Sequence, residues 1–143
     1  MSTAASTSAA ASGIDGLQGT ALSVSFTVKE LKSSIAWYRD VLGFTVSQEY
    51  ERDGGLRAAA MTAGPVRILL NQDDGAKGWT RVKGEGFAVQ VTTDQSIDAL
   101  ADRAKANGGA LDLEPTDTPW GARLFRITDP DGFKLSISSP RRA

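Results

Sequence analysis

The sequence predicts an α+β fold in which two βαβββ modules form a cupped, mostly antiparallel sheet with helices on its convex face. Three observations support this prediction. Several stretches alternate apolar and polar residues, two stretches repeat apolar residues at helical spacing, and both halves of the chain present these elements in the same order. A length of 143 residues is typical of a single domain.

The first 20 residues differ in composition from the rest of the chain. They are mostly Ala, Ser, Thr and Gly and contain neither a basic start nor a run of large apolar residues, so they do not resemble a secretory signal. We expect residues 1–20 to be a disordered tail, because such a segment buries too little apolar surface to offset its ordering entropy. No segment approaches the roughly 20 apolar residues of a membrane span. The sequence therefore predicts one soluble, cytoplasmic domain over residues 21–143, with no membrane partner.

The first module is predicted over about residues 21–71. Residues 22–28 (LSVSFTV) alternate as a strand does when only one of its faces is buried. A helix follows, ended by Gly43 as a C-terminal cap. Its apolar residues at helical spacing are Leu31, Ile35, Tyr38 and Leu42. Three strands are then predicted near residues 45–50, 56–61 and 66–71, separated by glycine-containing turns.

The second module is predicted over about residues 87–139, after a polar linker at residues 72–86. Residues 87–91 (FAVQV) alternate as a strand, and either Asp94 or Ser96 could cap the helix that follows. This helix has its apolar stripe at Ile97, Leu100, Ala101 and Ala104 and ends at Gly108-Gly109. The last three strands are expected near residues 110–113, 122–127 and 134–138, with a turn at residues 129–132.

The composition excludes several classes of function. The chain has no cysteine and no histidine, so it has no disulfide, no thiolate nucleophile and no catalytic machinery that depends on histidine. Any metal ion would have to be held by oxygen ligands alone. With 16 basic and 17 acidic side chains, the net charge of −1 gives no overall positive field for nucleic acid. We therefore expect no nucleic-acid partner.

Two motifs resemble a known family. Residues 34–44 (SIAWYRDVLGF) resemble the "FYRDVLGF" helix end of the vicinal oxygen chelate superfamily, which includes glyoxalase I, bleomycin resistance proteins and extradiol dioxygenases. Residues 119–121 (PWG), followed by residues 129–132 (DPDG), resemble its C-terminal signature. The resemblance covers about residues 21–139 and implies the glyoxalase/bleomycin resistance fold. It says little about the reaction, because one fold hosts many functions.

The same resemblance implies where a metal ion would be bound. The family's ligand positions fall on Ser23, Leu69, Gly86 and Ser136. Neutral serine hydroxyls are poor ligands, and the side chains of leucine and glycine supply no donor. Glu85 is the one neighbouring carboxylate, and one carboxylate does not make a site. We therefore expect no metal and no cofactor, and with them no metal-dependent chemistry.

What the resemblance then implies is a cavity lined by the strand face that points away from the helices. Small side chains stand where relatives carry long metal ligands, which leaves room for a sizeable organic molecule. The candidate ligand-binding residues on this face and at its rim are Ser23, Ser25, Thr27, Arg67, Asn71, Trp79, Ala88, Gln90, Trp120, Lys134 and Ser136.

The tryptophans call for separate interpretations. Trp37 lies on the first helix, where packing in the core is the expected role, as it is for Tyr38. Trp79 stands in the polar linker, where it is either a stacking lid or dimer contact, or a side chain that folds onto the surface. By resemblance, Trp120 lies near the mouth of the cavity and contacts ligand.

The preferred hypothesis is metal-independent binding, and hence sequestration, of a sizeable organic molecule, as in resistance to an antibiotic or other natural product. The resemblance also implies a homodimer that completes the cavity. The alternative is an enzyme of the same fold, a glyoxalase-like lyase or isomerase or a dioxygenase-type enzyme, with a non-standard or absent metal site. A third hypothesis is a module for protein interaction, whose cavity would be filled by its own side chains.

Overall fold

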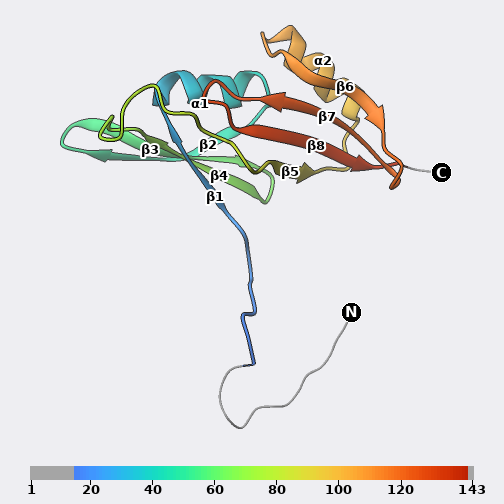
Figure 1. The fold of residues 1–143 in the computed structure, drawn as a ribbon, viewed down its shortest axis with the longest axis horizontal. Coiled ribbons are helices and arrows are strands. Elements are labelled where there is room, and N and C mark those ends of the chain that lie inside the picture. The colour runs from blue at the N-terminus through green and yellow to red at the C-terminus, as the bar shows by residue number, and fades with distance from the viewer. Residues whose placement is uncertain (1–14, 142–143) are drawn as a thin grey trace.

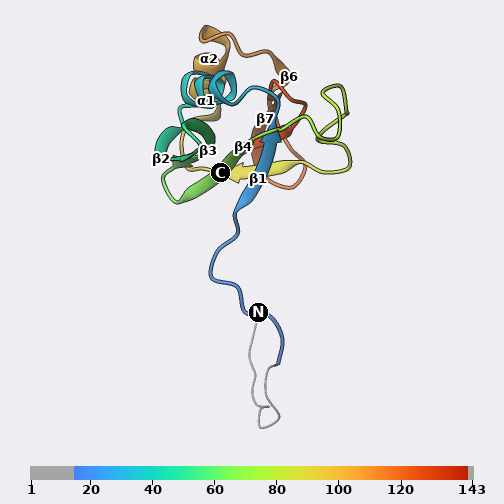
Figure 2. The ribbon, with the colours of Figure 1, turned by 90° about the vertical axis from the view of Figure 1, so that its left-hand side faces the viewer.

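The computed structural model describes residues 15–141 and consists of two modules that lie side by side, each with one helix over one face of its strands (Figures 1 and 2). The first module comprises β1 (Val24–Val28), α1 (Leu31–Asp40), β2 (Thr45–Arg52), β3 (Gly55–Ala63) and β4 (Val66–Gln72). The second comprises β5 (Val89–Thr92), α2 (Ile97–Ala106), β6 (Leu111–Asp117), β7 (Ala122–Thr128) and β8 (Lys134–Pro140).

Both modules have the same strand topology. The strand order is β1-β4-β3-β2 in one four-stranded sheet and β5-β8-β7-β6 in the other. The first strand of each module pairs in parallel with the last, β1 with β4 and β5 with β8, and the other pairs are antiparallel. The predicted α+β fold of two βαβββ modules is thereby confirmed, with the strands divided between two sheets.

One apolar core extends through both modules. In the inner strands, alternate residues turn toward the helices and join this core, as the alternation in the sequence predicts, whereas the edge strands β2 and β6 contribute less. Phe26 of β1 and Phe133, which precedes β8, stack with ring centroids 4.1 Å apart and so join the two sheets. Tyr38 is completely buried, and the half-buried Trp37 packs against the core, which confirms the roles expected for both residues.

Local capping sets the ends of both helices. The Glu30 carboxylate accepts a hydrogen bond from the backbone N–H of Ser33 at the start of α1. Gly43, with φ +83°, ends that helix, and its N–H donates to the carbonyl of Arg39. Of the two cap candidates for α2, Ser96 is the one used, because its hydroxyl accepts from the N–H of Ala99.

The observed strands differ from the predicted ones mainly in the second module. β5 begins at Val89 because Gly86 turns the chain with φ +83° and the ring of Phe87 tilts toward Phe26 and Phe133. β6 continues to Asp117, well past the predicted end, with two register irregularities opposite β7. As an edge strand it tolerates Pro115, which has no N–H to donate.

The predicted tail lies largely outside the described residues, since residues 1–14 are not among them. Residues 15–20 are exposed and form neither helix nor strand. Within the described part of the chain, no helix has the length and apolar character needed to cross a membrane.

Candidate functional site

The two sheet faces that point away from the helices, here termed the open faces, contain most of the predicted ligand-binding residues. Their orientation follows from the strand alternation. Leu135 and Ile137 belong to the core, so Ser136 between them points to the opposite side. The same reasoning applies to Gln90, which stands between Val89 and Val91. The alternation in the sequence thus places these side chains on one face.

The open face of the first module is formed by β1, β4, β3 and β2. The register pairs Ser25 with Leu69 and Thr27 with Asn71, which brings these predicted residues together. The Asn71 side-chain amide donates a hydrogen bond of 2.6 Å to the hydroxyl of Ser25. Arg67 donates to the hydroxyl of Tyr50 over 3.4 Å. Tyr50 was missed in the sequence, because register irregularities in β2 obscure which of its residues share a face.

The open face of the second module is formed by β5, β8, β7 and the edge strand β6. Gln90 lies opposite Ser136, and Ser136 lies opposite Arg126 on its other side. The Ser136 hydroxyl is buried and has no hydrogen-bond partner among residues 15–141. Lys134 donates to the carbonyl of Gly84 over 3.4 Å. Arg126 was missed in the sequence, although its place between Phe125 and Ile127 identifies it as an open-face residue once β7 is known.

Ser23 and Ala88 lie next to the N-terminal ends of β1 and β5. Both are exposed, one residue before β1 and one residue before β5. Their positions agree with a place at the rim of the open faces, where short side chains leave space.

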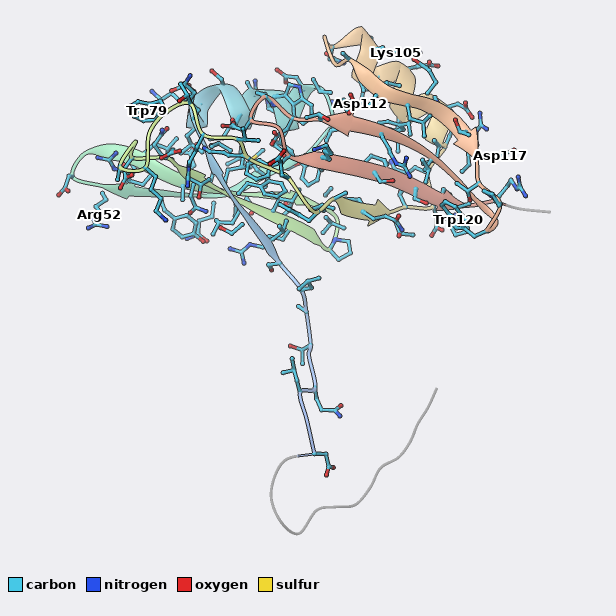
Figure 3. The ribbon with its side chains drawn as sticks, viewed as in Figure 1. Arg52, Trp79, Lys105, Asp112, Asp117 and Trp120 are labelled. Atoms are coloured by element: carbon cyan, nitrogen blue, oxygen red, sulfur yellow. The ribbon has the colours of Figure 1, made fainter. Side chains whose placement is uncertain are left out.

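The structure separates the two predicted tryptophans (Figure 3). Trp79 is half-exposed and packs its ring on Gly75, in a depression beside the N-terminal end of α1 and apart from the open faces. Trp120 lies at the opposite end of the molecule, in the turn between β6 and β7, with 70% of its surface exposed. The two rings therefore cannot contact one small ligand within a single chain.

The residues at the family's metal positions do not fit a metal ion. Ser23 lies outside the strand, Leu69 has no donor, and Ser136 offers one neutral hydroxyl. The register also shows that the position equivalent to Ser23 is Ala88 rather than Gly86, because Ser25 pairs with Leu69 as Gln90 pairs with Ser136. Alanine supplies no donor either. Across residues 15–141, no group of three or more His, Cys, Asp or Glu residues could hold a metal ion.

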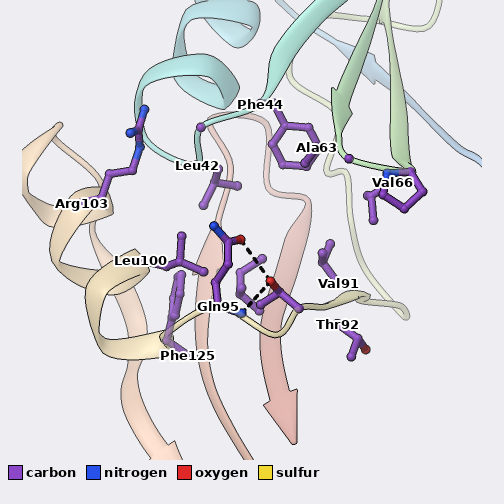
Figure 4. Close-up of a pocket in the computed structure, with 15 residues that line it drawn as sticks. Leu42, Phe44, Ala63, Val66, Val91, Thr92, Gln95, Leu100, Arg103 and Phe125 are labelled. Atoms are coloured by element: carbon purple, nitrogen blue, oxygen red, sulfur yellow. Dashed lines mark hydrogen bonds between the residues drawn. The ribbon is translucent and has the colours of Figure 1, made fainter.

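A separate pocket of about 460 Å³ lies between the modules, beside the C-terminal end of α1 and the apolar side of α2 (Figure 4). Its walls are largely apolar and include Leu42, Phe44, Val66, Val91, Leu100 and Phe125. Gln95 lies at its centre, where its side-chain oxygen accepts from the Thr93 hydroxyl, and Arg103 lies at its edge. None of the predicted site residues lines this pocket, because it exists only where the modules meet.

Two polar contacts among the packed elements hold the modules together. The hydroxyl of Tyr38 donates to the carboxylate of Asp129 over 2.7 Å. Burial raises the pKa of Asp129 above its ordinary range, against the opposing effect of this hydrogen bond. Burial, together with the nearby carboxylate, also raises the pKa of Tyr38, which therefore stays protonated and keeps donating.

Lys83 of the linker forms the second contact. Its ammonium group lies 2.8 Å from Asp73 and 3.6 Å from Asp131, and it donates to the carbonyl of Thr27. The hydrogen bond from Lys83 lowers the pKa of Asp73, and the N–H of Gly75 acts in the same direction. Lys83 thus joins the linker to β1 and to the turn before β8. These groups are structural, because they lie among the packed elements and away from the open faces.

The strand order and the two βαβββ modules are the features that define one superfamily of proteins. The chain belongs to the Glyoxalase/Bleomycin resistance protein/Dioxygenase superfamily, whose family model matches residues 20–137. This match confirms the resemblance in the sequence motifs. No curated protein sequence matches the chain.

Solved structures with the same fold cover nearly the whole chain. TioX from Micromonospora sp. ML1 is 19% identical, with a TM-score of 0.67 over 85% of this chain and 99% of that chain. A superfamily member from Sphaerobacter thermophilus DSM 20745 is 19% identical, with a TM-score of 0.69 over 85% and 98%. A domain from Frankia sp. EAN1pec is 22% identical, with a TM-score of 0.68 over 90% and 96%. At these identities the likeness shows the fold alone.

Proposed function

We propose that this protein binds a sizeable organic molecule on its open faces without a metal ion and without converting it. The observation that carries the proposal is the residue set on these faces. Ser23, Leu69 and Ser136 stand where metal ligands would be needed, and none of them makes a metal site. Without a metal ion, the fold still offers the two open faces as surfaces for binding an organic molecule.

The side chains on the open face of the first module leave room for a partly apolar molecule. Ser25, Thr27, Ala58 and Ala60 are short, so they leave space above the sheet. The hydroxyls of Ser25 and Thr27, with the amide of Asn71, provide a few polar contacts among apolar ones, which is the usual composition of a ligand site. Exposed Trp120 adds an aromatic surface near the second sheet.

The same faces do not favour catalysis. An acid–base mechanism without histidine would need a carboxylate or a similar group within reach of the ligand. The open-face positions of β1, β3, β4, β5, β7 and β8 carry no Asp or Glu. Tyr38 and Asp129, whose pKa values are raised by burial, are hydrogen-bonded to each other in the core. The enzyme alternative would therefore have to use Lys134 of β8, Tyr50 of β2 or Asp112 of the edge strand β6.

A second copy of the chain would enclose the ligand. Parts of each open face are exposed in the single chain, and so are large apolar side chains in the linker and just before the first strands of the modules. These side chains are Leu22 (96% exposed), Val82 (75%) and Phe87 (47%). Covering them in a dimer would remove apolar surface from water and close the open faces into a cavity.

Tryptophan fluorescence tests the proposal. The protein is dialysed against a chelator and titrated with a panel of large aromatic natural products, and each compound is recovered and analysed by mass spectrometry. We expect a saturable change in fluorescence that survives the chelator, with the compound recovered unaltered. The Trp120→Phe variant should lose much of the signal, and the Trp37→Phe variant, which lacks a core tryptophan, should retain it. A compound that is chemically changed, or binding that requires a divalent ion, would refute the proposal.

A further inference from the structure

We infer that the open face of the second module recognises an anionic oxygen group, a carboxylate, on the molecule that the protein binds. Arg126, Ser136 and Gln90 form the recognition site. The inference rests on the proposed function and adds to it the chemical class of the ligand.

These three side chains form one row across the sheet. The register places Gln90 of β5 opposite Ser136 of β8, and Ser136 opposite Arg126 of β7. Directly opposed residues on one sheet face have their Cβ atoms about 5 Å apart. All three point away from the helices, because their neighbours in each strand belong to or pack against the core. A hydroxyl, an amide and a guanidinium therefore stand on three neighbouring strands of one face, with Ser136 between the other two.

The hydroxyl at the centre of the row has no partner. Ser136 is 6% exposed, and its oxygen makes no hydrogen bond. Buried polar side chains nearly always have a partner, so an unpaired one indicates a missing group. Gln90 and Arg126 are exposed on either side of it, and nothing in the described chain holds their ends in place. Movement of these two side chains would open Ser136 to a ligand oxygen.

The charges on this face favour an anion. Within residues 15–141, the Arg126 side chain forms no hydrogen bond and no ion pair, so its guanidinium is free to bind a ligand. Lys134 adds a second positive charge two residues from Ser136 on the same strand face. Asp112 of the edge strand is the adjacent carboxylate, and it accepts a hydrogen bond from Thr128. A planar guanidinium with two parallel N–H donors matches the geometry of a carboxylate.

A matched pair of fluorescent probes tests this inference. The probes are 1-pyrenebutyrate and its neutral amide, which differ in the charged group alone. We expect the wild-type protein to bind the carboxylate about tenfold more tightly than the amide, the effect of one charge-assisted hydrogen bond. Arg126→Gln should abolish this preference. Arg39→Gln, the same change on the helix side of the molecule, should preserve it.

Ser136→Ala separates ligand recognition from a structural role. Because its hydroxyl has no partner, the variant should unfold at the same temperature as the wild type or a higher one. Its affinity for 1-pyrenebutyrate should nevertheless fall several-fold. Unchanged affinity would overturn the role of Ser136.

The two proposals fail in different ways. If the wild type binds both probes equally, or if Arg126→Gln keeps the preference, the recognition of a carboxylate is wrong and the proposed function stands. If neither probe nor any compound of the natural-product panel binds, both proposals are wrong.

Discussion

Tyr38 and Asp129 form a buried hydrogen bond between the two modules. Tyr38 belongs to the motif on α1, and Asp129 begins the turn before β8, so the contact joins the two family motifs in space. The other carboxylate oxygen of Asp129 accepts from the N–H groups of Asp131 and Phe133. The tyrosine of the first motif therefore contributes its hydroxyl as well as its ring.

We expect Tyr38→Phe to lower the free energy of unfolding by about 1–3 kcal/mol, because it leaves a buried carboxylate oxygen without its donor. Chemical denaturation with urea measures this change. Tyr50→Phe is the matched control. Tyr50 is partly exposed on β2, and its loss should change stability by less than about 0.5 kcal/mol. Equal effects of the two substitutions would show that the buried hydrogen bond does not contribute.

At the scale of elements, the linker is fixed to the second module by close backbone contact. Gly84 is buried, with φ +79°, and a Cβ atom there would overlap the carbonyl oxygen of Gly132. Gly86 has a similar φ of +83° but faces open space. The two glycines thus share a backbone conformation and differ in their surroundings.

Gly84→Ala should destabilise the protein by about 1–3 kcal/mol more than Gly86→Ala does, since only the first adds a steric overlap to the unfavourable φ. Thermal or urea unfolding of the two variants gives the comparison. Equal losses would mean that the linker does not dock against the turn before β8.

Lys83 makes the docking of the linker dependent on pH. The pKa of Asp73 is lowered by its hydrogen bond with Lys83, so its contribution to stability is present above the ordinary carboxyl range and is lost as the pH falls through the lowered pKa. Lys83→Met should therefore reduce the urea midpoint at pH 7, and the gap to the wild type should narrow below about pH 4. Lys32→Met, an exposed change on α1, should show neither effect. A gap that stays constant with pH would exclude the ion pair as its cause.

The elements could be predicted from the sequence to different extents. The alternation around Phe26 and the spacing of Leu31, Ile35 and Tyr38 are local patterns, and they located β1 and α1 correctly. The start of β5 could not be predicted in this way. Phe87 continues the apolar alternation of the strand, but its ring contacts Phe26 and Phe133 and the residue lies before β5. The extent of β6 depends on pairing with β7, which no local pattern encodes.

The candidate site was predictable only where strand faces determine it. The alternation placed Ser25, Asn71, Gln90 and Ser136 on the open faces. It gave no means of locating Trp79, which belongs to a loop and lies beside α1. The pocket around Gln95 arises from the contact of two modules, so residues far apart in the sequence form it together.

At the scale of the whole molecule, the exposed open faces predict self-association. Sedimentation velocity over a range of concentrations should give twice the monomer mass, because a dimer would cover Leu22, Val82 and Phe87. Phe87→Ser should weaken the dimer by removing a large apolar contact. A monomer at every concentration would show that the open faces bind ligand without a second copy, or that they bind none.

Native mass spectrometry is the most direct test of whether the protein binds an organic compound without a metal ion. The full chain is incubated with the natural-product panel, with and without prior chelation, and the intact complexes are weighed. We predict complexes whose mass equals that of the protein plus the unaltered compound, at the same abundance before and after chelation and with no divalent ion. If the complex carries one divalent ion per chain, and the compound binds only when this ion is present, metal-independent binding is wrong.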